Sequence, residues 1–334
     1  MYTSIVLPMQ ETINKIFVRG KGVFALDWSP KTISKKFSEV GLISTPSLNR
    51  VYRQMLLSTP GIEKFVSGVI LHDETIHQKL DSGESFPEFL IKKGIVAGVR
   101  GDKGGEKFGE TEQDMSVGLE DLDTRLKECA SMGIGFSKWR AGFKVSGIYP
   151  SKDFLEESIN RLADFAKISH QNNLVPFVEP DVEMDGNHTT ARCAEVTTEV
   201  LTLLFKKLKD EGIDLTKVIL KTNMVLPGSG SGVVAAPLEV ANTTLRVFKK
   251  SVPPEVPGIV FLSGGQSYDD AVEYLDKIED LSKGDPWKLS FSYARALQHD
   301  ALGEWKGESG NVEIAQKVLL TRLEKVSKAR NGQL

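Results

Sequence analysis

Eight short apolar segments recur along the chain, and their number and spacing restrict the folds that are open to it. Each segment is brief and rich in Val, Ile, Leu or Phe, which is typical of a strand buried on both faces. The segments cover residues 23–27, 65–72, 95–100, 136–145, 175–182, 218–225, 258–264 and 289–294. Longer amphipathic stretches separate most of them, so the pattern indicates alternating strands and helices and the α/β class.

The stretches between these segments predict helices. Residues 153–171 and 189–210 each place apolar side chains on one side at helical spacing. Residues 42–61 predict an extra helix between the first two strands. Ser267 and Asp270 resemble a capping box at the start of the helix after the seventh strand. The proline-rich segment 251–257 predicts an extended entry into that strand.

Eight strands at intervals of roughly 30–45 residues, with helices between them, favour a single (β/α)8 TIM barrel. The spacing alone also fits an open, doubly wound sheet. The sequence contains no internal repeat, low-complexity tract or interdomain linker. We therefore predict one domain that covers residues 1–334.

Composition excludes several classes of protein. The 334 residues are 40% hydrophobic and carry a net charge of −3, so no basic surface for nucleic acid is expected. No apolar run is long enough to cross a membrane. Residues 1–6 lack the basic region and hydrophobic stretch of a secretory signal. Two cysteines, Cys129 and Cys193, are too few for a disulfide scaffold, so we expect a cytoplasmic protein with reduced thiols.

Lys221 is a lone cation inside the apolar sixth segment. A charged lysine buried there costs several kcal/mol unless it is paired or gives up its charge. Burial lowers a lysine pKa, and a pKa of about 7–8 leaves an amine that can attack a carbonyl group. The alternative is a lysine at a strand end whose stem packs while its ammonium group reaches water.

Polar side chains lie in or at the end of most of the other predicted strands, where a barrel gathers its active residues. They are Asp27, Arg100, Lys138, Arg140, Glu179, Asp181, Ser263, Gly264, Ser292 and Arg295. Any one of them could be a structural charge with its own partner. A whole ring of acids and bases inside apolar strands favours a catalytic site that binds a small molecule.

Elementary electrostatics suggests roles for some of them. Lys138 close to Lys221 would lower the pKa of Lys221 by like-charge repulsion. Glu179 and Asp181 lie two apart on one strand and therefore share a face, and a carboxylate pair of this kind suits general acid–base work. Ser263, Gly264 and Gly265 before a helix would offer backbone N–H groups to an anion, and Arg295 would complete a phosphate site at the seventh and eighth strands.

Two further patterns do not indicate a site. The glycine-rich residues 228–232 lack the Gly-Lys-Ser/Thr ending of a phosphate-binding P-loop, so we interpret them as a mobile loop. The five histidines show no spacing typical of metal ligands, so we predict no metal site.

Taken together, these motifs resemble class I fructose-bisphosphate aldolase, the metal-independent Schiff-base enzyme. The similarity runs from about residue 20 to about residue 307. It rests on residues 220–225 (LKTNMV), 261–267 (FLSGGQS) and 291–297 (FSYARAL), with 138–140 (KWR) and 178–181 (VEPD) in the expected order.

The resemblance implies a closed barrel, often a homotetramer, that needs no cofactor and cleaves fructose 1,6-bisphosphate reversibly in glycolysis and gluconeogenesis. It implies that Lys221 forms the Schiff base and that Glu179 shuttles protons. It implies that Asp27 positions Lys221 and the substrate and that Lys138 supports the charge of early intermediates. The remaining implied contacts are Ser263, Gly264 and Arg295 to the C1 phosphate, Thr32, Lys36 and Arg100 to the C6 phosphate, and Arg140 and Ser292 to the substrate.

The chain departs from the family pattern at several of these positions. Lys36 stands where many relatives have an arginine, so the pair of parallel hydrogen bonds that a guanidinium group can donate to a phosphate is lost. Arg100 stands where a lysine is usual, and Asp181 replaces a glutamate. Residues 330–334 differ from the tyrosine-ended tail of animal relatives, so we expect another group to return the proton to the enamine, or that step to be slower.

Two other functions stay open at this point. The changed residues 32–36 leave room for a Schiff-base aldolase of a related ketose phosphate. The second alternative is a non-catalytic protein that keeps the barrel and binds other proteins. The full set of charged residues argues against such a loss of catalysis.

Overall fold

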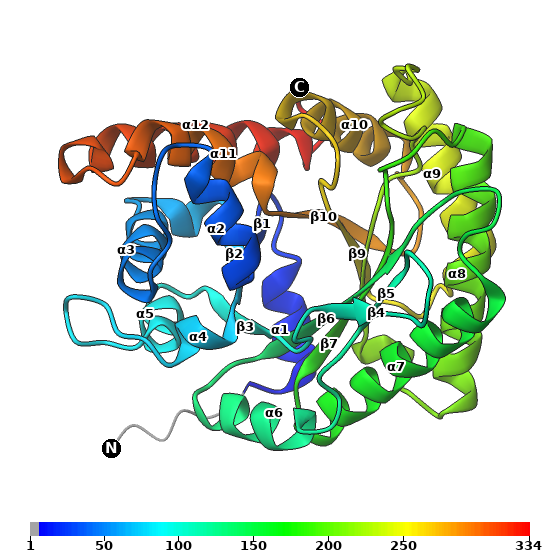
Figure 1. Cartoon of the computed structure of the whole chain (residues 1–334), viewed down its shortest axis with the longest axis horizontal. Helices are drawn as coiled ribbons and strands as arrows, with labels where there is room; N and C mark the ends of the chain where they lie inside the picture. The colour runs from blue at the N-terminus through cyan, green and yellow to red at the C-terminus, as the bar shows by residue number, and fades with distance from the viewer. Residues whose placement is uncertain (1–6) are drawn as a thin grey trace.

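The eight predicted strands close into one parallel barrel in the computed structural model, which describes residues 7–334. Neighbours around the barrel follow the order β1-β10-β9-β8-β7-β6-β3-β2, and helices surround it (Figure 1). The strands are β1 Gly22–Leu26, β2 Val66–Leu71, β3 Val96–Arg100, β6 Phe136–Phe143, β7 Val175–Val182, β8 Ile219–Thr222, β9 Gly258–Phe261 and β10 Lys288–Tyr293. The prediction of a (β/α)8 barrel is confirmed, and the open sheet is excluded.

β8 is shorter than the apolar segment that predicted it. Side chains take over the backbone hydrogen bonding where it ends: the N–H of Val182 donates to Asn223 Oδ1 at 3.1 Å, and the N–H of Val225 donates to Thr244 Oγ1 at 3.0 Å. Residues 223–225 are therefore buried without being part of the strand.

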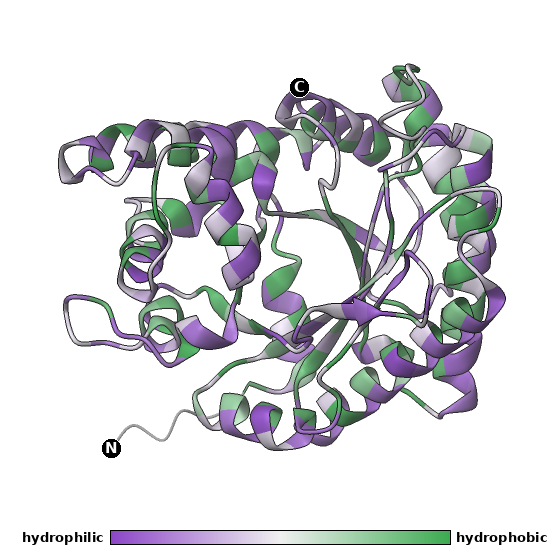
Figure 2. Cartoon of the chain, in the orientation of Figure 1, coloured by the Kyte–Doolittle hydropathy of each residue, from purple (hydrophilic) through white to green (hydrophobic). Residues whose placement is uncertain are grey.

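The longer helices wrap the outside of the barrel. Figure 2 shows hydrophobic colours concentrated on the strands and hydrophilic colours on the outer sides of the helices. The helices are α1 Met9–Ile16, α2 Pro30–Ser38, α3 Pro46–Leu57, α4 Asp73–Ile76, α5 Phe86–Lys92, α6 Leu122–Ser131, α7 Lys152–Gln171, α8 Thr190–Asp210, α9 Pro237–Ser251, α10 Tyr268–Leu281, α11 Arg295–Trp305 and α12 Val312–Ala329. None of these helices in residues 7–334 is both long and apolar enough to span a membrane.

Apolar side chains fill the amino end of the barrel, which leaves the carboxyl end for polar groups. Ile13 and Ile16 of α1 pack against the barrel interior in one cluster with Phe136 and Phe177, whose rings stack at 4.4 Å between centroids. This packing explains why the charged residues predicted from the sequence all lie toward the other end.

The structure corrects three local predictions. The extra helix predicted at residues 42–61 covers only Pro46–Leu57, and a further helix, α2, precedes it. The proline-rich segment is extended at Val252 but turns at residues 254–255, so it is not an extended entry throughout. Ser267 caps α10 by accepting from the N–H of Asp270 at 3.1 Å, without the reciprocal bond of a full capping box.

The antiparallel pair β4 Gly105–Lys107 and β5 Asp114–Ser116 was not predicted. Both strands are three residues long and carry no apolar run, so no periodic signal marks them. Cys129 and Cys193 are buried and free, and burial raises the pKa of the Cys129 thiol to about 12. Residues 1–6, on which the absence of a signal was judged, lie outside the described residues.

Candidate active site

Four charged side chains from four strand ends meet inside the carboxyl end of the barrel. Lys221 lies on β8, Glu179 on β7 and Lys138 on β6, and Asp27 follows β1. All four are buried, and Lys221 is only 4% exposed. In the parallel register of β6, β7 and β8, Val178 pairs with Leu220, so Glu179 and Lys221 come next to each other at the ends of that pairing, and Lys138 lies two residues before Arg140, the β6 partner of Glu179.

A continuous chain of ion pairs connects these groups. Lys221 Nζ lies 3.0 Å from Glu179 Oε1, and Lys138 Nζ lies 3.3 Å from Glu179 Oε2. Lys138 Nζ also lies 2.8 Å from Asp27 Oδ2. Lys221 therefore points into the barrel toward a carboxylate, and the alternative of an ammonium group that reaches water is excluded. A buried lysine is tolerated here because it is paired.

Opposite charges hold Asp27 and Lys138 in their ionised forms. Burial alone would raise the pKa of Asp27, but the cations Lys138, Lys221 and Arg100 together hold that pKa well below its usual range. Burial alone would lower the pKa of Lys138, but the surrounding carboxylates raise it instead. Asp27 pairs directly with Lys138, so its predicted influence on Lys221 acts through space and through Lys138.

Asp102 is a member of this cluster that the sequence analysis missed. It is 5% exposed, accepts hydrogen bonds from Arg100, and lies 3.6 Å from Lys138 Nζ. Its Oδ2 also accepts the backbone N–H of Arg140 at 3.3 Å. Burial raises its pKa, but Lys138 and Arg100 outweigh that effect and lower it. An acid two residues beyond a predicted strand end was the signal that could have found it.

Glu179 and Asp181 are each neutralised by different cations. Arg140 Nε donates to Asp181 Oδ2 at 2.7 Å, and Arg140 Nη2 donates to Glu183 Oε1 at 2.9 Å. Glu179 instead contacts the two lysines. The predicted carboxylate pair is therefore divided between two ion-pair groups, and only Glu179 contacts Lys221.

The predicted phosphate loop lies beside Arg295. Arg295, the first residue of α11, donates from Nη2 to the carbonyl oxygen of Gln266 at 3.0 Å, and Ser263 in the same loop is buried. Gly265 has φ +78°, and an added Cβ would lie 2.7 Å from the sulfur of Met184. A glycine is thus required there by both conformation and space. The Ser292 hydroxyl, on β10, is buried and has no hydrogen-bond partner among residues 7–334.

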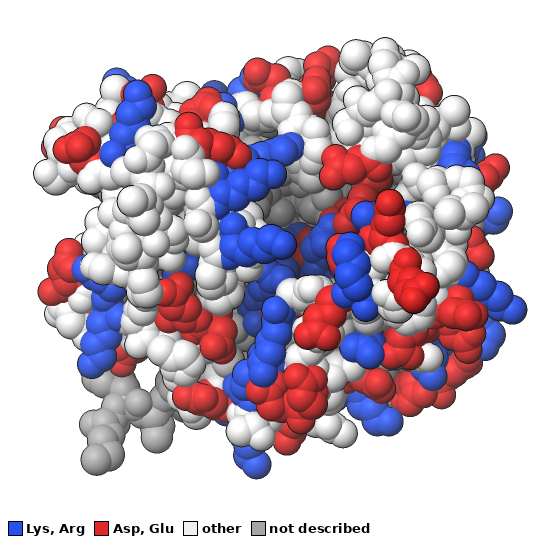
Figure 3. Space-filling view, in the orientation of Figure 1, with Lys and Arg blue, Asp and Glu red and all other residues white. Residues whose placement is uncertain are grey.

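The residues predicted to meet a second phosphate come from α2, which follows β1, and from the end of β3, and each has a local partner. Thr32 lies in the first turn of α2, where its hydroxyl is 3.0 Å from that of Ser29. Lys36 Nζ donates to Glu39 Oε1 at 2.7 Å. Arg100 pairs with Asp102. Figure 3 shows lysine and arginine side chains gathered around a hollow at the middle of this face, beside α2.

The glycine-rich loop at 228–232 packs along the loop that follows β7. Its backbone donates to that loop from Gly228, Ser229 and Gly230, at 2.7 to 2.8 Å. Across residues 7–334, no three His, Cys, Asp or Glu side chains are grouped in a way that could hold a metal ion.

The chain is similar to known proteins over nearly its full length. The family model described as "Fructose-bisphosphate aldolase class-I" matches residues 8–334. A fructose-bisphosphate aldolase of Encephalitozoon cuniculi is 41% identical over 97% of this chain and 95% of its own. The cytosolic fructose-bisphosphate aldolase 4 of Arabidopsis thaliana is 40% identical over 94% and 80%. A crystal structure of fructose-bisphosphate aldolase from Plasmodium falciparum, in complex with TRAP and an inhibitor, superposes with a TM-score of 0.94 at 39% identity, covering 97% of this chain and 94% of that one.

Proposed function

Because the chain belongs to the class I fructose-bisphosphate aldolase family, we propose that it cleaves fructose 1,6-bisphosphate reversibly into dihydroxyacetone phosphate and glyceraldehyde 3-phosphate. The reaction would run through an imine on Lys221. The observation that carries this assignment is the buried contact of 3.0 Å between Lys221 Nζ and Glu179 Oε1.

The chemistry follows from that contact. Glu179 accepts a proton from Lys221, whose neutral amine attacks the C2 carbonyl carbon of the ketose. The carbinolamine loses water with Glu179 as proton donor, and a protonated imine remains. Glu179, ionised again after the dehydration, would accept the proton of the C4 hydroxyl group as the C3–C4 bond breaks and the aldehyde leaves. The imine nitrogen takes up the electron pair of that bond, so the reaction needs no metal as electron sink. The resulting enamine takes up a proton, and water then releases the ketone.

The surrounding groups hold this pair in place. Lys138 contacts Glu179 and Asp27, so it would hold both carboxylates in place and support negative charge on the early intermediates. Asp27 would fix Lys138, which faces the substrate. Asp181 would hold Arg140 toward the substrate, a positioning role that replaces the proton-transfer role predicted for it.

The two phosphates of the substrate would bind to different groups of residues at the barrel mouth. Ser263, Gly264 and Arg295 would hold the C1 phosphate through hydroxyl, backbone and guanidinium donors. The Ser292 hydroxyl, which lacks a partner, would contact the sugar. Thr32, Lys36 and Arg100 would meet the C6 phosphate.

Trapping the imine tests this proposal. Borohydride reduction in the presence of dihydroxyacetone phosphate, followed by peptide mass mapping, should give a stable adduct on Lys221. An adduct on another lysine, or none in a preparation that turns over, would overturn the assignment.

Turnover should also survive EDTA, because the protonated imine supplies the electron sink. The measurement is the cleavage rate before and after dialysis against the chelator. A loss of activity that Zn²⁺ restores would contradict the Schiff-base route.

Substrate choice between bisphosphate and monophosphate ketoses tests the C6 site. Lys36→Gln should raise KM for fructose 1,6-bisphosphate by about tenfold, as expected for one charged contact to phosphate, and leave KM for fructose 1-phosphate unchanged. Lys35→Gln, an exposed neighbour on the same helix, is the matched control. An equal change in KM for both ketoses in Lys36→Gln would show that Lys36 does not contact the C6 phosphate. Separately, faster turnover of fructose 1-phosphate than of fructose 1,6-bisphosphate by the unmodified enzyme would favour a related ketose phosphate as the substrate.

Assembly and location are proposed from the family and the relatives. A homotetramer is typical of the family, and size-exclusion chromatography with light scattering would measure the subunit number. The cytosolic relatives of Arabidopsis support a cytoplasmic location in glycolysis and gluconeogenesis. We also propose that the whole chain forms one domain around the barrel.

A further inference from the structure

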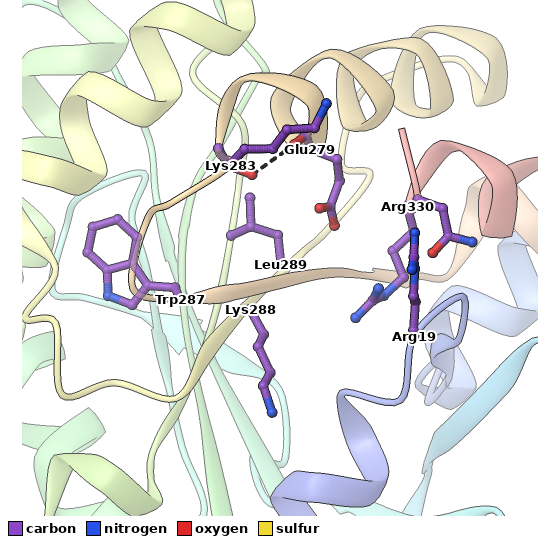
Figure 4. Close-up of a pocket in the computed structure, with 9 residues that line it drawn as sticks. Arg19, Glu279, Lys283, Trp287, Lys288, Leu289 and Arg330 are labelled. Carbon is purple, nitrogen blue, oxygen red and sulfur yellow. Dashed lines mark hydrogen bonds between the residues drawn. The ribbon is translucent and has the colours of Figure 1, made fainter. Parts of the chain in front are cut away.

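A second pocket lies at the opposite end of the barrel from Lys221. Its volume is about 330 Å³, and one of its walls is the start of β10, whose first residue is Lys288. Figure 4 shows the residues that line it, which come from the segment before β1, the end of α10, β10 and the end of α12. Those that carry the argument are Arg19, Glu279, Trp287, Arg330 and Asn331.

Arg330 is a buried guanidinium group that forms no ion pair with any of the described residues. It is 7% exposed, and its Nε donates to Ser290 Oγ at 3.1 Å. Within residues 7–334, neither of its terminal nitrogens has a hydrogen-bond acceptor and no carboxylate lies within 4 Å. Burial lowers its pKa, and the attraction of Glu279 in the same pocket opposes this effect without outweighing it. An unpaired buried charge is costly, so an anion in this pocket would remove a penalty already present in the fold.

Glu279 faces the same space from α10. Its Oε1 is buried without a hydrogen-bond partner among the described residues. Burial raises the pKa of this carboxyl group to about 8, with Arg330 acting in the opposite direction and Asp276 adding to the rise. Near pH 7 the group is therefore mostly protonated, and it can donate a hydrogen bond to an anion.

The charges around the pocket are predominantly positive. Arg19 lies on its rim and is exposed. Lys283 is bound to Asp280 at 2.7 Å, and Lys288 points away from Glu279 in Figure 4. The pocket thus combines the guanidinium groups of Arg330, inside, and Arg19, on the rim, with the carboxyl group of Glu279 and with Asn331 Oδ1, which has no hydrogen-bond partner in residues 7–334.

From this arrangement we propose that the pocket is a binding site for a small phosphate-bearing anion. Two guanidinium groups match a dianion better than a single carboxylate charge, and guanidinium forks suit phosphate oxygens. Glu279 would donate to a third oxygen, and Asn331 Oδ1 would accept from a hydroxyl group on the ligand. Free phosphate and a phosphate monoester share this chemistry.

The test uses the full chain labelled with 5-fluorotryptophan and followed by ¹⁹F NMR. Trp287 lines the pocket. The other three tryptophan rings pack among helix side chains, Trp28 and Trp305 against Tyr52 and Trp139 against Phe165, so the Trp287 signal alone reports on the pocket. Replacing each tryptophan by phenylalanine assigns the signals.

Inorganic phosphate should shift the Trp287 signal saturably. Glycerol phosphate as a second probe distinguishes the sources: tighter binding than inorganic phosphate indicates a monoester, and weaker binding indicates the free ion.

Variants show whether the shift belongs to the pocket. Arg19→Gln, at an exposed position that does not threaten the fold, and Arg330→Gln should each weaken phosphate binding at Trp287 by about tenfold. Lys277→Gln, on α10 outside the pocket, should not change the affinity for phosphate.

In the unmodified protein, phosphate binding should weaken as the pH rises from 7.5 to 9, because Glu279 loses its proton. Glu279→Gln should remove that dependence on pH. An unchanged Trp287 signal, or a shift that Arg19→Gln leaves intact, would overturn the proposal.

Discussion

Lys221→Ala should lower turnover of fructose 1,6-bisphosphate by about 10⁴-fold or more, because the covalent route through the imine disappears with the amine. The residual rate would come from binding and from the charged groups that remain. The measurement is kcat in a coupled cleavage assay, together with borohydride trapping, which should give no adduct in this variant.

The same variant should stay folded. Glu179 keeps Lys138 as an ion-pair partner at 3.3 Å when Lys221 is removed, so no carboxylate is left unpaired. Lys217→Ala, which removes a half-exposed lysine four residues earlier that pairs with Asp214, is the control and should retain full activity. Turnover within tenfold of the unmodified enzyme would show that Lys221 is not the Schiff-base residue.

Lys138→Met should destabilise the protein as well as inactivate it, in contrast to Lys221→Ala. Lys138 lies within 4 Å of three carboxylates, on Asp27, Asp102 and Glu179, and its removal leaves buried negative charges underpaired. Loss of one partner of a buried ion pair costs about 3–5 kcal/mol. Urea unfolding at pH 7.5 would measure this difference against Lys127→Met, an exposed position on α6.

The pH dependence of that difference has a definite sign. The lowered pKa values of Asp27 and Asp102 contribute stability above the unfolded-state pKa of about 3.9, and this contribution is lost as the pH falls through their folded-state values. Without Lys138, the pKa values of Asp27 and Asp102 rise. In the variant these two carboxylates therefore take up protons at a higher pH than in the unmodified protein, and protonation removes the cost of their unpaired charges. The stability gap should therefore narrow between pH 7 and pH 4. A gap that stays constant over this range would contradict the ion-pair account.

The barrel and the centre of the site could be predicted from the sequence because both leave strong local signals. Strands that are buried on both faces consist of nearly continuous apolar residues, so a lysine within such a segment stands out in the sequence. The structure brings the side chains of Lys221, Glu179, Lys138 and Asp27 together, as the sequence predicts, and their catalytic roles stay predictions. The hairpin of β4 and β5 and the helix α2 were missed because short or polar elements have no comparable pattern.

Pairings across the site could not be predicted. Which carboxylate meets which cation depends on side-chain reach between strands that are distant in sequence. Glu179 and Asp181 share a strand face, yet Glu179 contacts lysines and Asp181 contacts Arg140. Asp102 lies just beyond the end of its predicted strand, and its importance arises only from its contacts with Arg100 and Lys138. The assignments for Thr32 and Lys36 stay predictions.

The ion-pair chain at the barrel centre has equal numbers of opposite charges: Asp27, Asp102 and Glu179 against Lys138, Lys221 and Arg100. On the proposed reaction, replacing an ammonium by a protonated imine preserves this electroneutrality, so the intermediate that holds the whole substrate leaves the local field unchanged. The enamine that follows cleavage is uncharged, and Glu179, which would then hold the C4 hydroxyl proton, is uncharged as well, so the cluster stays neutral. Transfer of that proton from Glu179 to the enamine would restore the positive imine and the negative carboxylate together, so each step of the proposed reaction keeps the enclosed charges balanced.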